Sequence, residues 1–237
     1  MRWRFEESIL FEDDNCLVIN KASGIASLHE RDASTMNVIT EARKYCSDAQ
    51  LCHRLDRETS GALIIAKNPE TYRSVSMAFE NRQVEKIYHA IVGGAVRMDE
   101  LQVNLPIYVN KKGLVKVDYK QGKEAVTLFQ SLEIFKHFTL MECMPITGRM
   151  HQIRVHLASQ NAAIAADIQY GGEMPFLSRI KSKFHHSKLD EEKPMIQRFA
   201  LHAFSLFVQT EKVQVDVKAP YPKDFDVFVK LLRKYDS

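Results

Sequence analysis

One carboxylate, Asp56, stands between two arginines in the stretch HRLDRETSG, residues 53–61. Nearby guanidinium groups lower the pKa of a carboxyl group, and a carboxylate that stays ionised suits a nucleophile better than a general acid. A glycosidase of the usual kind needs two carboxyl groups, one of them protonated, and Asp56 is badly placed for that acid role. The alternative for Asp56 alone is a structural ion pair at the start of a strand.

A second group of polar residues lies in PITGRMHQIRVHLASQ, residues 145–160, which predicts a helix capped by Thr147. His151 and Arg154 are three residues apart and are expected to share a helix face. Free N–H groups and the helix dipole attract anions to a helix N-terminus, so we expect a phosphate or carboxylate contact there. The alternative is a solvated surface helix. The donors crowded into two turns are Arg149, His151, Gln152, Arg154 and His156.

A third candidate is Tyr88, on a central strand predicted over residues 84–94. A tyrosine in such a strand is more often a core residue whose hydroxyl group is satisfied by a neighbour. If Tyr88 faces the same cleft as Asp56, its ring can stack on a base, as aromatic side chains do in RNA recognition. Its hydroxyl group is also able to exchange protons.

Composition narrows the class of protein. The chain of 237 residues carries a net charge of +3, which permits a polyanionic partner without requiring one. Four cysteines without close spacing argue against a zinc site or a disulfide framework, and His185 and His186 have no carboxylate or thiolate at ligand spacing. Gly93 and Gly94 match no glycine-rich nucleotide motif. The charged N-terminal segment MRWRFEESIL predicts no signal peptide, and no apolar run reaches ~18 residues, so we expect a soluble protein of the cytoplasm.

The apolar pattern predicts an α+β domain in which strands dominate. We expect buried strands at 16–21 and 62–67, an antiparallel meander of three segments over 114–144, a final hairpin and a C-terminal amphipathic helix. Asn68 and Pro69 are expected to open one helix. Ser34 or Thr35 is expected to cap another, whose apolar face is formed by Val38, Ile39, Ala42, Tyr45 and Cys46.

Five segments resemble the RluA-type pseudouridine synthase family in order and spacing, and the resemblance covers nearly the whole chain. The HRLD-x-x-TSG block is specific when TGR-x-HQIR follows it. Two positions depart from the family pattern: Ala166 stands where glycine is usual and Ala22 where proline is usual, which changes loop geometry rather than a reacting group. The segments are HRLDRETSG (53–61), KIYHAIVGG (86–94), TGRMHQIRVHLA (147–158), DIQYGG (167–172) and RFALHAFSL (198–206).

The resemblance implies a set of site residues. Asp56 matches the catalytic aspartate, Tyr88 the active-site tyrosine, and Arg154 the arginine that pairs with the aspartate. Leu201 matches an apolar residue lining the pocket, and Arg54 a side chain that enters the space left by the flipped uridine. The residues expected to bind substrate are Arg54, Arg57, Arg149, His151 and Leu201.

The resemblance also implies the fold and the reaction. We expect one catalytic domain over residues 1–237, built on a mixed, mostly antiparallel sheet with flanking helices and a central catalytic cleft. A basic insertion at 173–197, with its Lys/Arg/His-rich stretch at 179–188, has no assigned role. No S4 domain is expected at the N-terminus, and a monomer is expected.

The implied reaction is isomerisation of uridine to pseudouridine at specific positions in structured ribosomal or transfer RNA, without cofactor or metal. The uridine must first leave its stack. Asp56 then attacks C1′ of the ribose or C6 of the base, or assists formation of a glycal, and the sequence does not choose among these. Two alternatives are a non-catalytic RNA-binding protein that uses the same cleft and a nucleoside-bond hydrolase.

Overall fold

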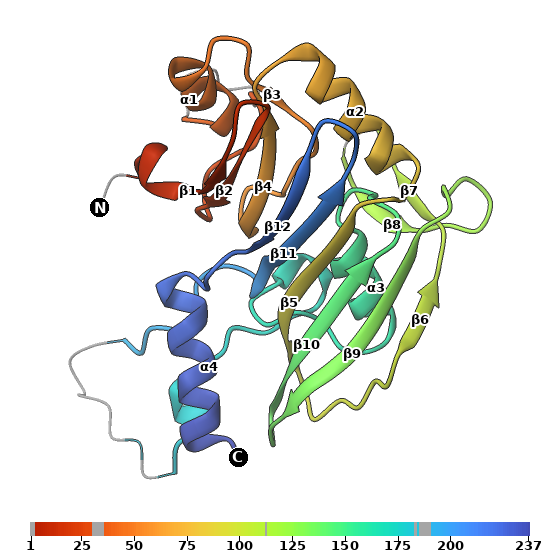
Figure 1. Cartoon of the computed structure of the whole chain (residues 1–237). Coiled ribbons are helices and arrows are strands. Elements are labelled where there is room, and N and C mark those ends of the chain that lie inside the picture. The colour runs from red at the N-terminus through yellow and green to blue at the C-terminus, as the bar shows by residue number, and fades with distance from the viewer. Residues whose placement is uncertain (1–2, 30–35, 112, 183, 185–190) are drawn as a thin grey trace. The chain divides into compact units, whose positions relative to one another are not determined.

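The computed structural model describes residues 3–29, 36–111, 113–182, 184 and 191–237 (Figure 1). Contacts divide the chain into two compact units, Met1–Tyr88 with His202–Tyr221 and His89–Leu201 with Pro222–Ser237. Strands β5 (Glu85–Gly93) and β11 (Leu201–Gln209) contribute residues to both units. The strands form a mixed, mostly antiparallel sheet and helices accompany them, so the predicted α+β class is confirmed.

The strands of the first unit are organised around β4 (Ser60–Ala66). It pairs antiparallel with β2 (Cys16–Lys21) and with β3 (Gln50–Leu51). It also pairs in parallel with the start of β11, through His202 with Ser60 and Ala203 with Gly61. Two further antiparallel strands complete this part, β1 (Ile9–Glu12) on β2 and β12 (Gln214–Lys218) on β11.

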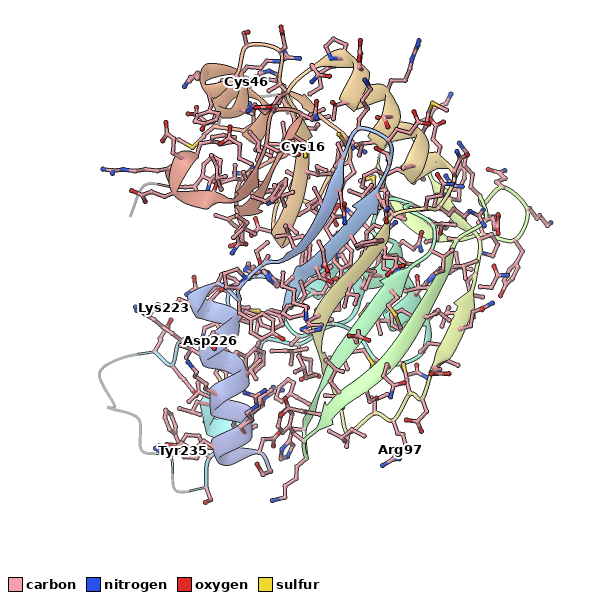
Figure 2. The ribbon with its side chains drawn as sticks, in the orientation of Figure 1. Cys16, Cys46, Arg97, Lys223, Asp226 and Tyr235 are labelled. Atoms are coloured by element: carbon pink, nitrogen blue, oxygen red, sulfur yellow. The ribbon has the colours of Figure 1, made fainter. Side chains whose placement is uncertain are left out.

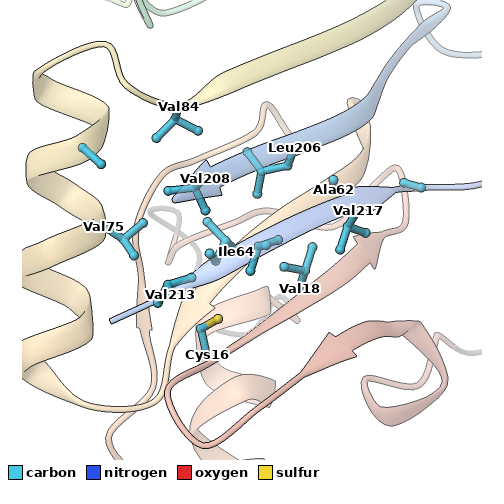
Figure 3. Packing of buried hydrophobic residues seen from close by; sticks show 13 residues of the cluster. Cys16, Val18, Ala62, Ile64, Val75, Val84, Leu206, Val208, Val213 and Val217 are labelled. Atoms are coloured by element: carbon cyan, nitrogen blue, oxygen red, sulfur yellow. The ribbon is translucent and has the colours of Figure 1, made fainter. Parts of the chain in front are cut away.

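Both faces of β2 and β4 are covered, which explains why their sequences are continuously apolar. Alternate residues, such as Val18 and Ile64, pack with α2 (Pro69–Glu80) and β12, as Figure 3 shows. The residues between them, such as Ile19 and Leu63, pack with α1 (Val38–Tyr45). The predicted strands at 16–21 and 62–67 are therefore confirmed.

The two helices of the first unit start at asparagine caps. The side chain of Asn68 accepts a hydrogen bond from the Thr71 N–H, and Pro69 occupies the first turn, as predicted. The cap of α1 is Asn37, which accepts from Thr40 N–H, and not Ser34 or Thr35. Those two residues lie outside the described part of the chain. The apolar pattern located this helix correctly, but any of several short polar residues before it was able to cap it.

In the second unit β10 (Phe138–Pro145) and β9 (Val126–Ile134) pair antiparallel, and β6 (Leu101–Asn104) pairs with β9. The first segment of the predicted meander is wrong, because β8 (Val115–Val117) pairs with β7 (Ile107–Val109) in a separate two-stranded sheet. The remaining elements are α3 (Gln152–Ser159), α4 (Lys223–Tyr235) and 3-10 turns at Glu6–Ser8, Ile168–Tyr170 and Leu177–Arg179.

Helix α4 confirms the predicted C-terminal amphipathic helix. Its buried Phe228 meets Phe138 of β10 edge to face, with ring centroids 5.4 Å apart. Figure 2 shows Lys223, Asp226 and Tyr235 along this helix. The described helices include none with the length and apolar composition needed to cross a bilayer.

Candidate active site

A buried lysine holds the loop that carries Asp56. Lys21, at the end of β2, is fully buried, and its ammonium group donates three hydrogen bonds of 2.8–3.0 Å. Because the acceptors are main-chain oxygens, their partial charges stabilise a cation that burial would otherwise penalise. One acceptor belongs to the residue directly after Asp56. The three carbonyl groups are those of Ala22, Ile25 and Arg57.

Reciprocal hydrogen bonds fix the main chain on both sides of Asp56. Ser27 Oγ donates to the carbonyl oxygen of Leu55 at 2.7 Å and accepts from its N–H at 3.1 Å. The N–H of Gly24 donates to the carbonyl oxygen of Arg57 at 2.9 Å, and Arg57 Nε donates to the carbonyl oxygen of Gly24 at 3.0 Å. The half-buried side chain of Asp56 therefore extends from a backbone with little freedom.

The Thr-Ser-Gly sequence behind Asp56 has a steric reason. Gly61 has φ +116°, and a Cβ atom there would lie 2.2 Å from the carbonyl oxygen of Ala203 on β11. Ser60 Oγ lies 2.9 Å from His202 Nδ1, and His202 Nε2 lies 3.1 Å from the carbonyl oxygen of Ala219. Since Nε2 must donate to that carbonyl group, Nδ1 of the neutral ring accepts from the serine. Only glycine allows this close approach of β4 and β11.

Tyr88 lies in the same unit as Asp56 and close enough for their charges to interact. The half-buried ring packs against the core cluster that includes Leu55 and Ala203. Burial, and then the negative charge of Asp56, raise the pKa of the Tyr88 hydroxyl group well above its ordinary value of ~10. Tyr88 therefore stays protonated near neutral pH in this structure.

The arginines beside Asp56 differ in their surroundings. Arg54 is exposed, as its predicted role requires, since a side chain that replaces a flipped base must be free to move into RNA. Arg57 is also exposed, but its Nε already holds the carbonyl oxygen of Gly24. Arg57 thus shapes the loop in addition to any contact with phosphate.

In the second unit Arg154 is held by a carboxylate that we did not assign to it from the sequence. Its Nε and Nη2 donate to the two carboxylate oxygens of Asp167 at 2.7 and 2.8 Å, and both side chains are buried. The guanidinium carbon lies 4.2 Å from the ring centroid of Phe199 and 4.8 Å from that of Tyr170. A buried arginine requires an anion, and Asp167 is the first residue of the DIQYGG segment. That was the signal available in the sequence.

The expected helix around Arg154 begins later than predicted. α3 starts at Gln152, and His151 is its N-cap in the left-handed region with φ 54°. His151 and Arg154 therefore do not share a helix face. Thr147 is not the cap, because its buried Oγ accepts from Val126 N–H and donates to Gln152 Oε1. The surface-helix alternative is also wrong, since residues 152–157 are buried.

The other predicted residues of this unit have these positions. His151 Nδ1 lies 2.7 Å from the Tyr170 hydroxyl group, and the exposed Arg149 donates from Nε to the carbonyl oxygen of Glu124. Leu201 is buried at the start of β11. His156 is a core residue and not a ligand donor, because its ring nitrogens lie 2.9 Å from Thr127 Oγ1 and 3.0 Å from the carbonyl oxygen of Leu105.

One of the two departures from the family pattern, Ala166, lies at a backbone position that favours glycine. It has φ +63°, the left-handed region that glycine adopts without strain. Among the described residues no group of His, Cys, Asp and Glu is arranged to hold a metal ion. His185 and His186 lie outside that part of the chain.

Comparison with known proteins places the chain in a family. A family model described as RNA pseudouridylate synthase matches residues 15–159, more than half of the chain. The chain is 34% identical to ribosomal large subunit pseudouridine synthase C of Pasteurella multocida, over 99% of this chain and 70% of that protein. It is 34% identical to the dual-specificity RNA pseudouridine synthase RluA of Vibrio parahaemolyticus, over 78% of each. The chain belongs to the RluA-type RNA pseudouridine synthases.

Solved structures agree with this assignment. The human RNA pseudouridylate synthase domain containing 4 is 26% identical, with a TM-score of 0.73 over 97% of this synthase and 94% of that chain. The human RNA pseudouridylate synthase domain containing 1, 24% identical with a TM-score of 0.70, has the same fold. The predicted family and enzyme class are confirmed, and the matched region of this RNA pseudouridine synthase contains Asp56, Tyr88 and Arg154.

Proposed function

We propose that this synthase isomerises specific uridines in structured RNA, with Asp56 as the nucleophile on a flipped-out nucleotide. The observation that supports it most is the half-buried carboxylate on a fixed loop, close enough to raise the pKa of the Tyr88 phenol. Relatives named as ribosomal large subunit synthases make ribosomal RNA the first substrate to test. A relative named as dual-specific makes transfer RNA the second.

The proposed mechanism starts when the target uridine leaves its stack. Asp56 attacks C1′ or C6, or assists a glycal route, while the bond from C1′ to N1 breaks and C1′ bonds to C5. Where Asp56 has formed a bond to C1′ or C6, that bond breaks again and restores the free carboxylate. C5 then loses its proton and N1 gains one, so no atoms enter or leave. Because Tyr88 keeps its own proton, we assign its ring to stacking on uracil, and another base removes the C5 proton.

The proposed role of Arg154 is to keep Asp56 ionised and oriented. Its guanidinium group is anchored by Asp167 and by two aromatic rings. A fixed arginine orients a carboxylate better than a mobile one, because less conformational entropy is lost when the pair forms. Asp56 belongs to the first unit and Arg154 to the second, and their pairing stays a prediction.

The test of the nucleophile is Asp56→Asn, which keeps the size of the side chain and removes its charge. We expect no pseudouridine in single-turnover assays with ribosomal RNA fragments, while the Kd for RNA stays within about threefold of the wild type, roughly 0.7 kcal/mol. Asp48→Asn, at an exposed aspartate, is the matched control and should react normally. An Asp56→Asn protein with normal turnover contradicts the proposal.

The substrate is identified by mapping pseudouridines in RNA from cells with and without the gene. We expect at least one uridine of ribosomal or transfer RNA to lose its modification, and the purified wild type should restore it. Binding without isomerisation would instead support the non-catalytic RNA-binding alternative. Release of free uracil would support the hydrolase.

A further inference from the structure

Lys86 is a charged residue of the first unit for which the mechanism above has no use. It precedes Tyr88 by two residues on β5, and alternate residues of a strand face the same side. The neighbouring side chains Glu85 and Ile87 line a cavity together with Ser205 and Asp216. Lys86 therefore shares the face of Tyr88, and the carboxylate of Glu85 belongs to the other face.

The contacts of Lys86 connect it to the segment that carries Asp56. Its ammonium nitrogen lies 5.7 Å from the ring centroid of Phe79, on α2. The ring of His53, the first residue of HRLDRETSG, stacks on the same phenylalanine with centroids 4.7 Å apart. Burial, and then the charge of Lys86, lower the pKa of His53 to about 3, so this histidine is a neutral neighbour and not a competing cation.

Among the described residues, none supplies an anionic partner to the ammonium group of Lys86. In the described part of the chain it has no hydrogen bond and no ion pair, and its aromatic contact is with Phe79. Burial lowers its pKa to about 8, so the group is still mainly protonated at neutral pH. A cation withdrawn from water without a counter-ion is costly, and such groups are found where a ligand supplies the missing charge.

The substrate supplies an anion at a suitable spacing. Every nucleotide of RNA carries one phosphate charge. Alternate residues of a strand are ~7 Å apart, so Lys86 lies one such repeat from the ring on which the uracil would stack. The base and the phosphate group of one nucleotide are likewise separated by a ribose.

We propose that Lys86 binds the backbone phosphate group of the flipped nucleotide. This inference rests on the proposed function, since it takes the uracil to lie on Tyr88. The ring of Phe79 lies beside the ammonium group of Lys86, and the phosphate replaces the water that burial removed. Lys86 thereby fixes the nucleotide by its backbone, independently of base identity.

The experiment compares wild type with Lys86→Met and Lys86→Arg on an RNA stem-loop that contains the mapped uridine. Methionine keeps the apolar stem against Phe79 and removes the charge, whereas arginine keeps the charge. We expect Lys86→Met to bind about tenfold more weakly, since a hydrogen bond to a charged group contributes on that order, and its log–log salt slope to fall by about 0.7. Lys86→Arg should recover most of the affinity.

A second RNA, with a neutral methylphosphonate in place of the target phosphate, locates the contact. Wild type should lose about tenfold in affinity on this RNA, while Lys86→Met should bind both RNAs alike, because the two changes remove the same interaction. Lys218→Met is the matched control, since Lys218 is an exposed lysine that lines the cavity on the Glu85 face. It should show wild-type affinity and the full loss on the methylphosphonate.

Three results would overturn the inference: wild-type affinity of Lys86→Met, an equal methylphosphonate loss in Lys86→Met and wild type, or indifference of wild type to the methylphosphonate. The last comparison needs no variant, so it decides even if Lys86→Met does not fold. Pseudouridine formation by wild type is measured on the unmodified RNA in parallel. Its absence would count against the proposed function, whereas normal turnover with any of the three results would count against Lys86 alone.

Discussion

At the scale of single residues, the Asp56 and Tyr88 pair limits the chemistry available to each. Burial, and then the charge of Asp56, raise the pKa of the Tyr88 phenol, which keeps its proton near neutral pH. We therefore propose that Tyr88 donates a hydrogen bond and stacks, and that it does not remove the C5 proton. In this proposal the rate enhancement comes from the carboxylate and from the geometry of the bound nucleotide.

This division of roles predicts the pH dependence of the chemical step. A phenolate base with a pKa far above neutrality would make the rate rise about tenfold for each pH unit. We expect instead a nearly flat single-turnover rate between about pH 7 and pH 9, because the proposed mechanism keeps Tyr88 protonated and assigns removal of the C5 proton to another base. Rapid-quench measurement of pseudouridine over this range checks it. A slope near one in log rate against pH would show that the Tyr88 phenolate is the reacting base.

The sequence identified some residues of the site better than others. Asp56 and Tyr88 were identified because both lie within motifs. Asp56 is followed by a buried strand, and Tyr88 lies on a strand that the apolar pattern predicted. Asp167 was not assigned, because its pairing with Arg154 depends on how the chain returns after α3. Lys21 was not recognised either, since a lysine at the end of a strand is usually exposed, and only the fold shows three carbonyl groups around its ammonium.

At the scale of elements, the long apolar patterns and the cap at Asn68 were predicted correctly, whereas the caps expected at Ser34 or Thr35 and at Thr147 were wrong. β2, β4 and α2 lie where the sequence predicted them, because burial on two faces or a cap with proline leaves a local signal. The pairing of β8 with β7 and the late start of α3 were not predicted. Both depend on partners distant in the chain, and the left-handed backbone at His151 has no signature in its side chain.

Gly61 gives a prediction at this scale. Gly61→Ala forces a Cβ atom against the backbone of Ala203, and neither strand is able to yield without loss of the parallel pairing. We expect the free energy of unfolding to fall by roughly 3 kcal/mol or more. The rate of pseudouridine formation should fall with it, because the displaced strand follows the loop of Asp56. Urea denaturation followed by circular dichroism measures the change.

Gly24→Ala is the matched control for this substitution. Gly24 also has a positive φ, +80°, but a Cβ atom there meets nothing within 4 Å. The alanine therefore costs only its left-handed conformation, about 1–2 kcal/mol. If Gly61→Ala were no more destabilising than Gly24→Ala, the contact between β4 and β11 would not be the reason for the Thr-Ser-Gly sequence.

At the scale of the whole molecule, each unit contains a histidine that burial keeps neutral. Burial, and then Lys86, lower the pKa of His53 in the first unit to about 3. Burial also lowers the pKa of His156 in the second unit, against the opposing effect of its hydrogen bond to Leu105. The two histidines, one in each unit, thus contribute to a shared property, the response of the fold to acid.

The sign of this response follows from proton binding. Above pH ~6.5 both histidines are neutral in the folded and unfolded states, and they add no pH dependence. As the pH falls from 6.5 towards 3, the unfolded chain binds protons at His53 and His156 that the folded chain does not. The free energy of unfolding therefore decreases over this window, by roughly 4 kcal/mol for His53 alone.

His53→Gln keeps an acceptor for the Ile64 N–H and removes the titrating group. We expect the loss of stability between about pH 7 and pH 4, measured by urea denaturation, to be smaller in His53→Gln than in wild type. His156→Gln should reduce it in the same direction through the second unit. If His53→Gln loses as much stability as wild type over this range, His53 binds its proton equally in the folded and unfolded chains. Burial and the charge of Lys86 would then not lower its pKa.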